Sequence, residues 1–570
     1  MRIPSVLINI AALGFCFGFS LLKLQAQPQQ NTFCNPLNLD YRFEISNLAS
    51  YRTAADPVVV TYKGDYYLFA SKSGGYWWSS DFLNWNFVEP SDDIQIEKYA
   101  PAILVMGDSM FYTSSQSGDS YLSTNPKSGH WKRIGHAGDW KDPALFLDDD
   151  GRVYCYYGLQ KNGSIKVVEL DPKNDFKVIG DEKICLTADF KSHGFEKRGD
   201  NNEIEEAPYI EGAWMTRYNG AYYLEYSAPG TQFRSYALGC YRAPSPTGPF
   251  TYCPNSPTTA RHRGFVAGVG HGCTFKDLSG KYWNISTVVV SVLHKFERRL
   301  AVFPIDYDKD GLPYTLTNFG DYPQYLPGIK TNPEKGNLAG WNLLSRSKKA
   351  TASSSIDTHK PSLAFDEDIK TWWSATTDNT GEWLAVDLKT PTTIHAVQVN
   401  FAEQGTTAKG RNENFAQKYL LEASVDGQKW KTIHQKTDEK DAPHDYVELE
   451  KPIITKHIRI TNLGQAAGGG KFAIRDLRVF GDAKINLPEK VKKISVSRNP
   501  KDKRSATIKW EPVPNADGYQ IRYGIAPDKL YNHYQIFSEE TSCVINSLNV
   551  DQEYVFVVDS YNEAGLTKGK

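Results

Sequence analysis

The fold is decided by residues 55–69, ADPVVVTYKGDYYLF, which read as a short apolar strand, a glycine turn and a tyrosine-rich second strand. The same pattern recurs four more times with unequal insertions, over residues 99–112, 141–154, 210–224 and 270–283. One such hairpin cannot bury both of its faces alone, whereas repeated copies can pack against one another. The repeat therefore predicts five β-sheet blades around a common axis.

One position of the repeat carries the chemistry. The first strand of each blade lines the central channel, so equivalent residues converge from distant parts of the chain. Our alignment of the five copies places at this position Asp56, Ala100, Asp142, Glu211 and His271. A single acid beside proline is usually a turn residue. Three carboxylates at one register repel one another and raise their pKa values, which indicates a functional site.

Converging carboxylates are suited to hydrolysing a glycosidic bond. The reaction needs a general acid and a general base, held roughly 6.5–9.5 Å apart for inversion or about 5–5.5 Å apart for retention. Acids on different blades can meet either spacing. A third carboxylate beside the acid would raise its pKa and keep it protonated near neutrality.

Residues 33–328 resemble glycoside hydrolase family 43, the five-bladed propeller hydrolases. The motifs that carry the resemblance are Ala55-Asp56-Pro57, Lys141-Asp142-Pro143, Tyr209-Ile210-Glu211-Gly212 and Gly270-His271-Gly272. The resemblance implies that Asp56 is the general base, that Asp142 orients the acid and tunes its pKa, and that Glu211 is the general acid. It also implies inversion in one displacement, without a cofactor for catalysis.

The resemblance leaves several assignments open. His271 is implied to approach a central cation, such as calcium, or a water cluster. Ala213 stands where the family most often has proline, and Glu205 and Glu206 compete with Glu211 as acids outside the repeat register.

Substrate-binding residues are less determined by the sequence. Aromatic rings stack on sugars but also fill the space between blades, and an arginine can bind hydroxyls or form an inter-blade salt bridge. On the functional interpretation, the substrate-binding set is His271, Tyr76, Trp78, Trp214 and Arg298.

The second half of the chain changes character. Residues 342–482 resemble the discoidin-like (factor 5/8 C-type) sandwich shared with carbohydrate-binding module family 32, through motifs such as AFDED (364–368) and EWLAVDL (382–388). The resemblance implies that Trp373 and Trp383 are core residues. It also implies that Asp366 and Asp368 lie in a structural calcium loop, since hard carboxylate oxygens suit Ca²⁺. The sequence does not assign the sugar-binding loop of this module.

Residues 488–570 resemble a fibronectin type III module. The resemblance rests on ATIKW (506–510), GYQIRY (518–523) and a tyrosine corner at Tyr554, six residues after Leu548. Such modules space domains, so we expect no chemistry here. We also expect small-substrate turnover to survive removal of the residues after about 340.

Charge and composition exclude some classes of partner. Lysine and arginine total 65 against 66 acidic residues, a formal charge of −1, which lacks the positive field of nucleic-acid binders. Seven cysteines follow the N-terminal segment, an odd number without a C-x-x-C pair, so neither a disulfide framework nor a zinc site is predicted.

The N-terminus predicts export. Residues 1–26 read as a signal peptide with an apolar run over 6–22 and cleavage after Ala26. Lipid attachment at Cys16 is the alternative, disfavoured because Phe15 stands where a small residue is expected. No later stretch approaches ~18 uninterrupted apolar residues, so no membrane span is predicted.

Together these features predict an all-β chain: a five-bladed propeller, a discoidin-like sandwich and a fibronectin-like sandwich. The predicted function is that of a secreted or periplasmic, exo-acting, inverting glycosidase acting on plant-type polysaccharides or oligosaccharides. Terminal α-L-arabinofuranosyl units are the first expectation, with β-xylosyl and β-galactofuranosyl units left open. The alternative is a non-catalytic glycan-binding propeller whose sandwich adds avidity.

Overall fold

The computed structural model describes residues 30–570 except 47, 92, 93, 95, 97, 98, 116, 330, 332–335 and 412–414. The chain divides into two compact units, Met1–Gln30 and Asn31–Lys570, and the second is described below. The predicted signal peptide, including Cys16, lies outside the described residues. Strands dominate, and the helices of the described part are four short 3₁₀ turns: η1 (Pro126–Ser128), η2 (Gly194–Glu196), η3 (Pro361–Ala364) and η4 (Ala467–Gly469).

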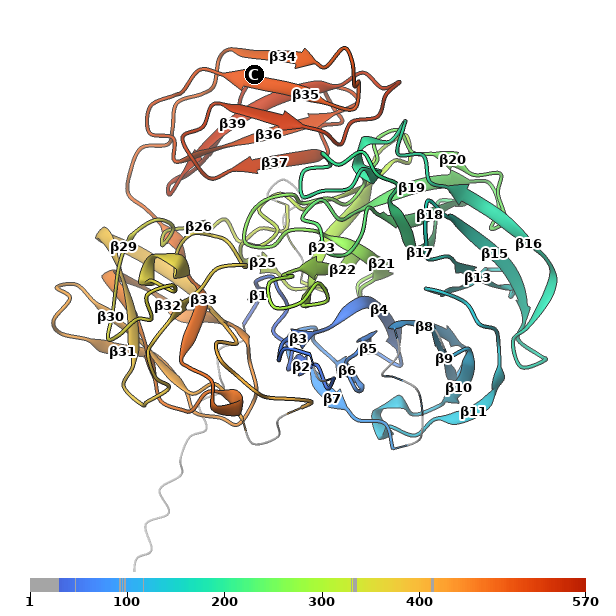
Figure 1. The fold of residues 1–570 in the computed structure, drawn as a ribbon, viewed down its shortest axis with the longest axis horizontal. Coiled ribbons are helices and arrows are strands. Elements are labelled where there is room, and N and C mark those ends of the chain that lie inside the picture. The colour runs from blue at the N-terminus through green and yellow to red at the C-terminus, as the bar shows by residue number, and fades with distance from the viewer. Residues whose placement is uncertain are drawn as a thin grey trace, which may run out of the picture. The chain divides into compact units, whose positions relative to one another are not determined.

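Five antiparallel sheets follow one another in the first part of the described chain (Figure 1). Blade one contains β4 (Ala55–Tyr62), β5 (Asp65–Ser71), β6 (Tyr76–Ser79) and β7 (Asn86–Val88). Blade two contains β8 (Tyr99–Met106), β9 (Ser109–Ser115), β10 (Asp119–Ser123) and β11 (Lys132–His136). Blade three contains β12 (Ala144–Leu147), β13 (Val153–Tyr157), β15 (Ser164–Asp171) and β16 (Lys177–Thr187).

The last two blades have the same order of strands. Blade four contains β17 (Tyr209–Tyr218), β18 (Ala221–Ala228), β19 (Ala237–Ala243) and β20 (Thr251–Tyr252), with β14 (Gln160–Lys161) added at its inner edge. Blade five contains β21 (Gly270–Lys276), β22 (Tyr282–Val289), β23 (Arg298–Tyr307) and β24 (Pro313–Thr315).

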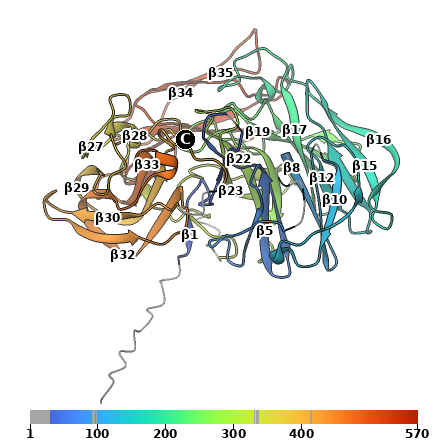
Figure 2. The same ribbon diagram turned by 60° about the horizontal axis from the view of Figure 1, so that its bottom comes forward.

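The innermost strands close into a ring. Strand β4 contacts β8, β8 contacts β12, β12 contacts β17, β17 contacts β21, and β21 returns to β4. Figure 2 shows β5, β8 and β12 of the first three blades side by side. This is the arrangement that the five-fold repeat predicts, and it brings the start of each first strand to the axis.

The tyrosine-rich second strands follow from this packing. Successive side chains of β5 point to opposite faces, and both faces of a blade are covered by neighbouring blades. Tyr66 and Leu68 pack in a cluster shared with blade five, whereas Tyr67 and Phe69 pack in a cluster shared with blade two. Large aromatic residues on both faces therefore fill the wedge between blades, which explains much of the aromatic content.

Two further short pairs complete the first part. Strand β1 (Thr32–Phe33) pairs with β25 (Gln324–Tyr325), which joins the two ends of the propeller segment. Strand β2 (Arg42–Phe43) pairs with β3 (Arg52–Thr53) just before blade one.

The next module is a β-sandwich built on one continuous hydrogen-bonded set of strands. Its members are β26 (Asn342–Leu343), β27 (Lys349–Ala352), β28 (Trp373–Ser374), β29 (Trp383–Phe401), β30 (Tyr419–Ser424), β31 (Lys431–Lys436), β32 (His444–Asn462) and β33 (Ala473–Asp482). Trp373 is fully buried in its core, as predicted. Trp383 is only half-buried and faces the Arg459 guanidinium, so the core assignment of that residue is wrong.

The last module contains two sheets that face each other. One has the order β34 (Ile494–Arg498), β35 (Ala506–Trp510), β38 (Ser542–Ile545), and the other β37 (Asn532–Ile536), β36 (Gly518–Gly524), β39 (Val555–Asn562), β40 (Gly565–Thr567). The Asn549 amide donates to the Tyr554 hydroxyl at 3.1 Å, the contact expected of a tyrosine corner.

Two findings concern the whole described part. Its seven cysteines are free thiols. None of its helices has the length and apolar character required to cross a lipid bilayer.

Candidate active site

The first strands of the propeller share a kinked start. Asp56, Ala100, Asp142 and His271 have positive φ angles of 52°, 45°, 50° and 39°, and Gly212 has 61°. In blades one, two, four and five the pairing of the first and second strands slips at this point. A positive φ is uncommon for residues with a side chain, and a bulge re-aims the residue that adopts it. The kink turns these residues toward the end of the central channel at which the first strands start, which we call the mouth.

The bulge corrects the predicted register of blade four. Glu211 pairs with Ser227 as Ala55 pairs with Ser71, so the equivalent of Asp56 is Gly212 and Glu211 lies one residue earlier. A Cβ atom on Gly212 would meet the His271 ring at 2.8 Å. The residue must therefore be glycine, and the acid reaches the mouth from the neighbouring position. The apolar pattern of a strand does not reveal a bulge, which is why the alignment misplaced it.

Hydroxyl groups connect neighbouring blades by hydrogen bonds at the kinked residues. In four of the five blades, the backbone N–H of the kinked residue donates to a serine or threonine at or near the end of the second strand of the preceding blade. The pairs are Asp56 with Thr287 at 2.8 Å, Ala100 with Ser71 at 2.7 Å, Asp142 with Ser115 at 3.3 Å and His271 with Ser227 at 2.8 Å.

The hydrogen bond from a hydroxyl is missing between blades three and four. Gly158 lies opposite Lys141 in blade three, the place that a serine or threonine takes in the other blades. It offers no hydroxyl, and the Gly212 N–H donates to the Asp142 carboxylate instead. Asp142 is thereby fixed directly beside the backbone of the residue that follows Glu211.

Asp56 lies in an environment that favours its ionised form. Its carboxylate accepts a hydrogen bond from Ser71 at 2.5 Å and lies 3.4 Å from Arg298 Nη1 and 3.2 Å from His271 Nδ1. Burial alone would raise the pKa of Asp56, but Arg298, His271 and Ser71 outweigh it and hold the pKa below its ordinary value. A carboxylate that stays ionised is suited to act as a base.

Glu211 and Asp142 lie in the opposite kind of environment. Burial raises the pKa of Glu211 to about 7, although a 2.5 Å hydrogen bond from the Tyr236 hydroxyl opposes this. Burial and the charges of Glu211 and Asp56 raise the pKa of Asp142 well above its ordinary value. The Asp142–Glu211 pair therefore holds a proton near neutrality, as a general acid must.

Arg298 and His271 bridge these groups. Arg298 is 3% exposed, and besides Asp56 it reaches Thr231 at 3.4 Å, while its Nε and Nη2 atoms have no hydrogen-bond partner. Buried guanidinium N–H groups without partners are rare, so they are available to a ligand's oxygens. His271 Nδ1 lies 3.7 Å from Asp142, and burial lowers the pKa of the imidazole, although the charge of Asp56 opposes this.

The aromatic residues predicted to bind substrate lie elsewhere. Tyr76 is fully buried between blades one and two, where its hydroxyl donates to the Pro126 carbonyl, so it cannot touch a ligand. Trp78 is on the same third strand and lies under Lys127, 3.8 Å from its ring centroid. Trp214 is half-buried against the core, with its indole N–H on the Thr274 carbonyl at 2.8 Å. All three take the packing role that was the alternative.

The competing acids are excluded by their partners. Glu205 is bound by Arg504, Lys191 and Lys197, and although burial opposes this, the cations lower its pKa to about 2. Glu206 pairs with Arg198. Glu205 therefore keeps no proton to donate near neutrality.

The acidic loop that is predicted to bind calcium also contacts the propeller. Both Asp368 oxygens accept from Arg234 of the propeller, at 2.7 and 2.8 Å, and Asp366 accepts from Thr371. No cluster of three or more His, Cys, Asp or Glu side chains suited to a metal ion occurs in the described part of the chain. Because calcium also takes backbone carbonyl and hydroxyl oxygens, a calcium ion at Asp366 and Asp368 or beside His271 stays a prediction.

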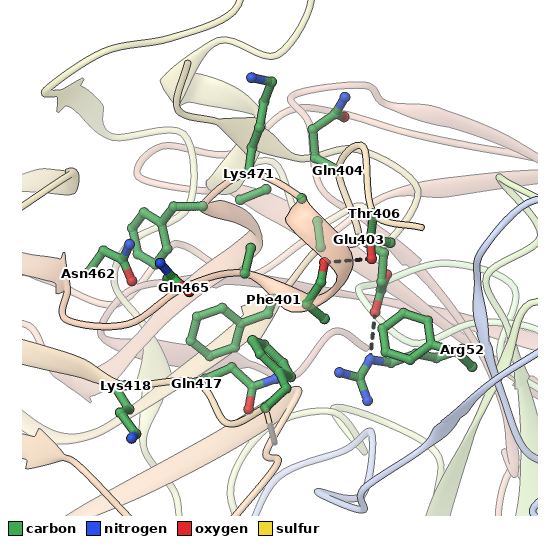
Figure 3. Close-up of a pocket in the computed structure, with 18 residues that line it drawn as sticks. Arg52, Phe401, Glu403, Gln404, Thr406, Gln417, Lys418, Asn462, Gln465 and Lys471 are labelled. Atoms are coloured by element: carbon green, nitrogen blue, oxygen red, sulfur yellow. Dashed lines mark hydrogen bonds and ion pairs between the residues drawn. The ribbon is translucent and has the colours of Figure 1, made fainter. Parts of the chain in front are cut away.

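A pocket of about 50 Å³ lies apart from the acids (Figure 3). It is bounded by loops of the sandwich and by the segment before blade one, and Figure 3 shows Arg52 reaching Glu403 beside it. It contains none of the mouth carboxylates, so we do not assign the chemistry to it.

Sequence reasoning missed Tyr236 and the clasping hydroxyls. The hydroxyls had a signal, because Ser71, Ser115, Ser227 and Thr287 each lie within the last three residues of a second strand of the repeat. Tyr236 lies in an insertion after blade four's second strand, so the repeat offers no signal for it.

Comparison with known proteins supports both large modules. Residues 48–313 match the family model for glycosyl hydrolases family 43, and residues 349–477 match the F5/8 type C domain. The match over 48–313 covers all five positions at the channel mouth.

The curated relatives share parts of the chain. A beta-D-galactofuranosidase of Aspergillus niger is 36% identical over 113 residues, which are 20% of this chain and 27% of the relative. A xylosidase/arabinosidase 43A of Humicola insolens is 35% identical over 136 residues, 20% of this chain and 40% of the relative. The chain thus spans well under half the length of either. A solved glycoside hydrolase aligns at a TM-score of 0.45 and 19% identity, over 78% of this chain and all of the other.

Proposed function

We propose that the propeller is a glycosidase in which Asp56 activates water, Glu211 protonates the leaving oxygen and Asp142 holds the proton on Glu211. One observation carries the proposal: carboxyls at one channel mouth have pKa values pushed in opposite directions, Asp56 down and Glu211 to about 7. An acid and base on one fold need such a separation at neutral pH.

The placement of these groups supports a bond held between them. Asp56 lies near the start of β4 and Glu211 near the start of β17, and these strands are not neighbours, since β21 separates them on one side of the ring. The two carboxyls therefore face the axis from different sides, with His271 on β21 between them. Attack and protonation from opposite sides is the arrangement that inversion requires.

For the substrate we propose a terminal furanosyl or pentosyl unit of a plant-type polysaccharide, removed outside the cell after export on residues 1–26. An α-L-arabinofuranoside is the first candidate, and β-xylosides and β-galactofuranosides are the others. The activities named for the curated relatives, xylosidase/arabinosidase and beta-D-galactofuranosidase, support this set. Discrimination within the set is left to assay.

The test is a panel of 4-nitrophenyl α-L-arabinofuranoside, β-D-xyloside and β-D-galactofuranoside. We expect turnover of at least one, lost in Asp56→Asn and Glu211→Gln but kept in Glu422→Gln, a carboxyl bound by Arg459 in the sandwich. Full activity in both mouth variants would refute the assignment. The anomer formed first, followed by NMR, tests inversion. Sugar binding without turnover of any substrate would favour the glycan-binding alternative.

A further inference from the structure

Arg475 of the sandwich reaches into the propeller. It lies on β33, its side chain is 1% exposed, and its Nη2 atom binds Glu297 at 2.6 Å and Glu403 at 2.8 Å. Its Nη1 atom donates to the Ile369 carbonyl at 2.8 Å. Glu297 belongs to the propeller and the other two residues to the sandwich, so one guanidinium joins both modules.

Glu297 organises the loop that leads to Arg298. One of its carboxylate oxygens accepts the N–H groups of Val292 and Leu293 at 3.1 and 2.8 Å, and the other takes Arg475. Its carbonyl accepts the N–H groups of Val290 and Ser291. The carboxylate thus closes residues 290–297, and the next residue places its guanidinium on Asp56.

A second contact supports the loop on the other side of Arg298. Asp368 binds Arg234, which belongs to the segment 229–236 that carries Thr231 against Arg298 and Tyr236 against Glu211. Between the two contacts Ile369 is 3% exposed and packs among valines and phenylalanines of the propeller, including Val288 and Val290. The loop that contains Asp366 and Asp368 therefore leads into an apolar contact with the propeller, which has an ion pair on each side.

The charges at this contact are buried and balanced. Glu403 binds Arg475, Arg299 and Arg52, the last contact being the one drawn in Figure 3. Arg52 also binds Asp441 at 2.5 Å. Removing one member of such a set leaves a buried charge without its partner, which the structure can relieve only by moving.

We propose that the sandwich of residues 342–482 is a structural part of the catalytic centre, with Arg475 as a positioning residue that holds Arg298 against Asp56 through Glu297. This rests on the proposed function of the mouth. It replaces the expectation that removal of the residues after about 340 leaves small-substrate turnover intact.

The experiment compares Arg475→Gln with Arg459→Gln in the full-length chain. Arg459 is a matched control, because it holds Glu422 through two hydrogen bonds within the sandwich. We expect Arg475→Gln to lose about tenfold or more in kcat on the best nitrophenyl glycoside, with a smaller change in KM, since displacing a group at the reacting centre by 1 Å can cost about 10²-fold. Arg459→Gln should stay within about twofold.

The pH profile separates positioning from loss of fold. The basic groups that face Asp56 are Arg298 and His271. The acidic groups near it are Asp142 and Glu211. If Arg298 withdraws, the pKa of Asp56 rises, so the acid limb of the kcat/KM profile moves to higher pH in Arg475→Gln. Fewer folded molecules would lower the whole profile without moving this limb.

Hydrogen exchange gives a readout that does not need activity. We expect residues 290–298 to exchange faster in Arg475→Gln than in wild type or Arg459→Gln. If Arg475→Gln does not fold, Asp368→Asn provides the milder test, with the same shift on a smaller scale. A folded Arg475→Gln with unchanged exchange, rate and acid limb overturns the proposal. Faster exchange without turnover of any glycoside by wild type supports the anchor but refutes the proposed function.

Discussion

Two sets of buried carboxylates in this molecule differ in how many arginines face them. At the channel mouth Asp56, Asp142 and Glu211 share Arg298. At the contact between propeller and sandwich, Glu403 alone faces three arginines. Although burial opposes it, those arginines lower the pKa of Glu403, whereas the pKa values of Asp142 and Glu211 are raised.

The difference teaches how to tell a site from a structural network. A buried carboxylate with its own cations is ionised and holds parts together, while carboxylates short of cations keep a proton and are costly to the fold. Such a cost persists where the chemistry requires it. Each of the following predictions tests this contrast, starting from the largest effect.

Removing the proton donor at the mouth should have the largest effect. Glu211→Gln keeps the shape but cannot transfer a proton, so we expect kcat to fall about 10²–10⁴-fold. Its free energy of unfolding should be unchanged or slightly higher, because one of three competing acids is gone. Steady-state kinetics and thermal unfolding measure the two quantities. A large loss of stability would show that Glu211 belongs to the structural class.

Removing a buried arginine that pairs with structural carboxylates should lower the stability of the fold. Arg478 is fully buried, binds Glu367 at 2.7 Å and lies 4.0 Å from Asp321. Arg478→Met leaves these carboxylates without their shared cation, which should cost about 3–5 kcal/mol of stability. The exposed pair of Lys493 and Glu511 is the control, and Lys493→Met should change the unfolding free energy by less than about 0.5 kcal/mol. Equal stability of the two variants would contradict the structural role that we assign to buried arginine–carboxylate pairs.

The pH dependence should report the mouth directly. Glu211 acts as acid only when protonated, so kcat/KM should fall as the pH rises through about 7. The Tyr236 hydrogen bond lowers that pKa, so Tyr236→Phe should move the basic limb upward, by about one pH unit or less. Tyr241→Phe on a neighbouring strand is the control. A downward movement would show that Tyr236 stabilises the protonated form instead.

The smallest effect is expected in the C-terminal sandwich. Tyr554→Phe removes the hydroxyl that accepts the Asn549 amide, which should cost about 1 kcal/mol of stability. The kinetic constants should not change, because no carboxylate of the mouth contacts this module. Thermal unfolding and kinetics check the two statements, and a fall in kcat would show coupling that the contacts do not explain.

The repeat predicted the ring and brought Asp56, Asp142 and His271 to one mouth because strand, turn and tyrosine pattern are local properties. It misplaced Glu211 by one residue, since a bulge changes pairing without changing the apolar pattern. Motif resemblance still selected Glu211 over Glu205. The cations that neutralise Glu205 come partly from Arg504, about 300 residues away, which no local pattern reveals.

The acidic loop of the sandwich shows the limit most clearly. Asp366 and Asp368 have the composition of a cation site, but the partner of Asp368 is an arginine 134 residues earlier. Tyr76 and Trp78 have the composition of a sugar platform, but they lie on a third strand, away from the axis. The contacts of Asp368, Tyr76 and Trp78 arise only through tertiary packing, so residue type and motif resemblance could not reveal them.

Gly158 makes blade three differ from the other four blades. Five similar blades related by rotation would offer a ligand five equivalent approaches. A side chain at residue 158 would meet the Ser164 carbonyl at 2.3 Å, so blade three cannot carry the hydroxyl that the other blades use. The freed amide at Gly212 binds Asp142, and the mouth loses its rotational symmetry at that blade. On the proposed function, a sugar that enters the channel meets Asp142 and Glu211 on one side and Asp56 on the other, so the direction of proton transfer is set before the sugar binds.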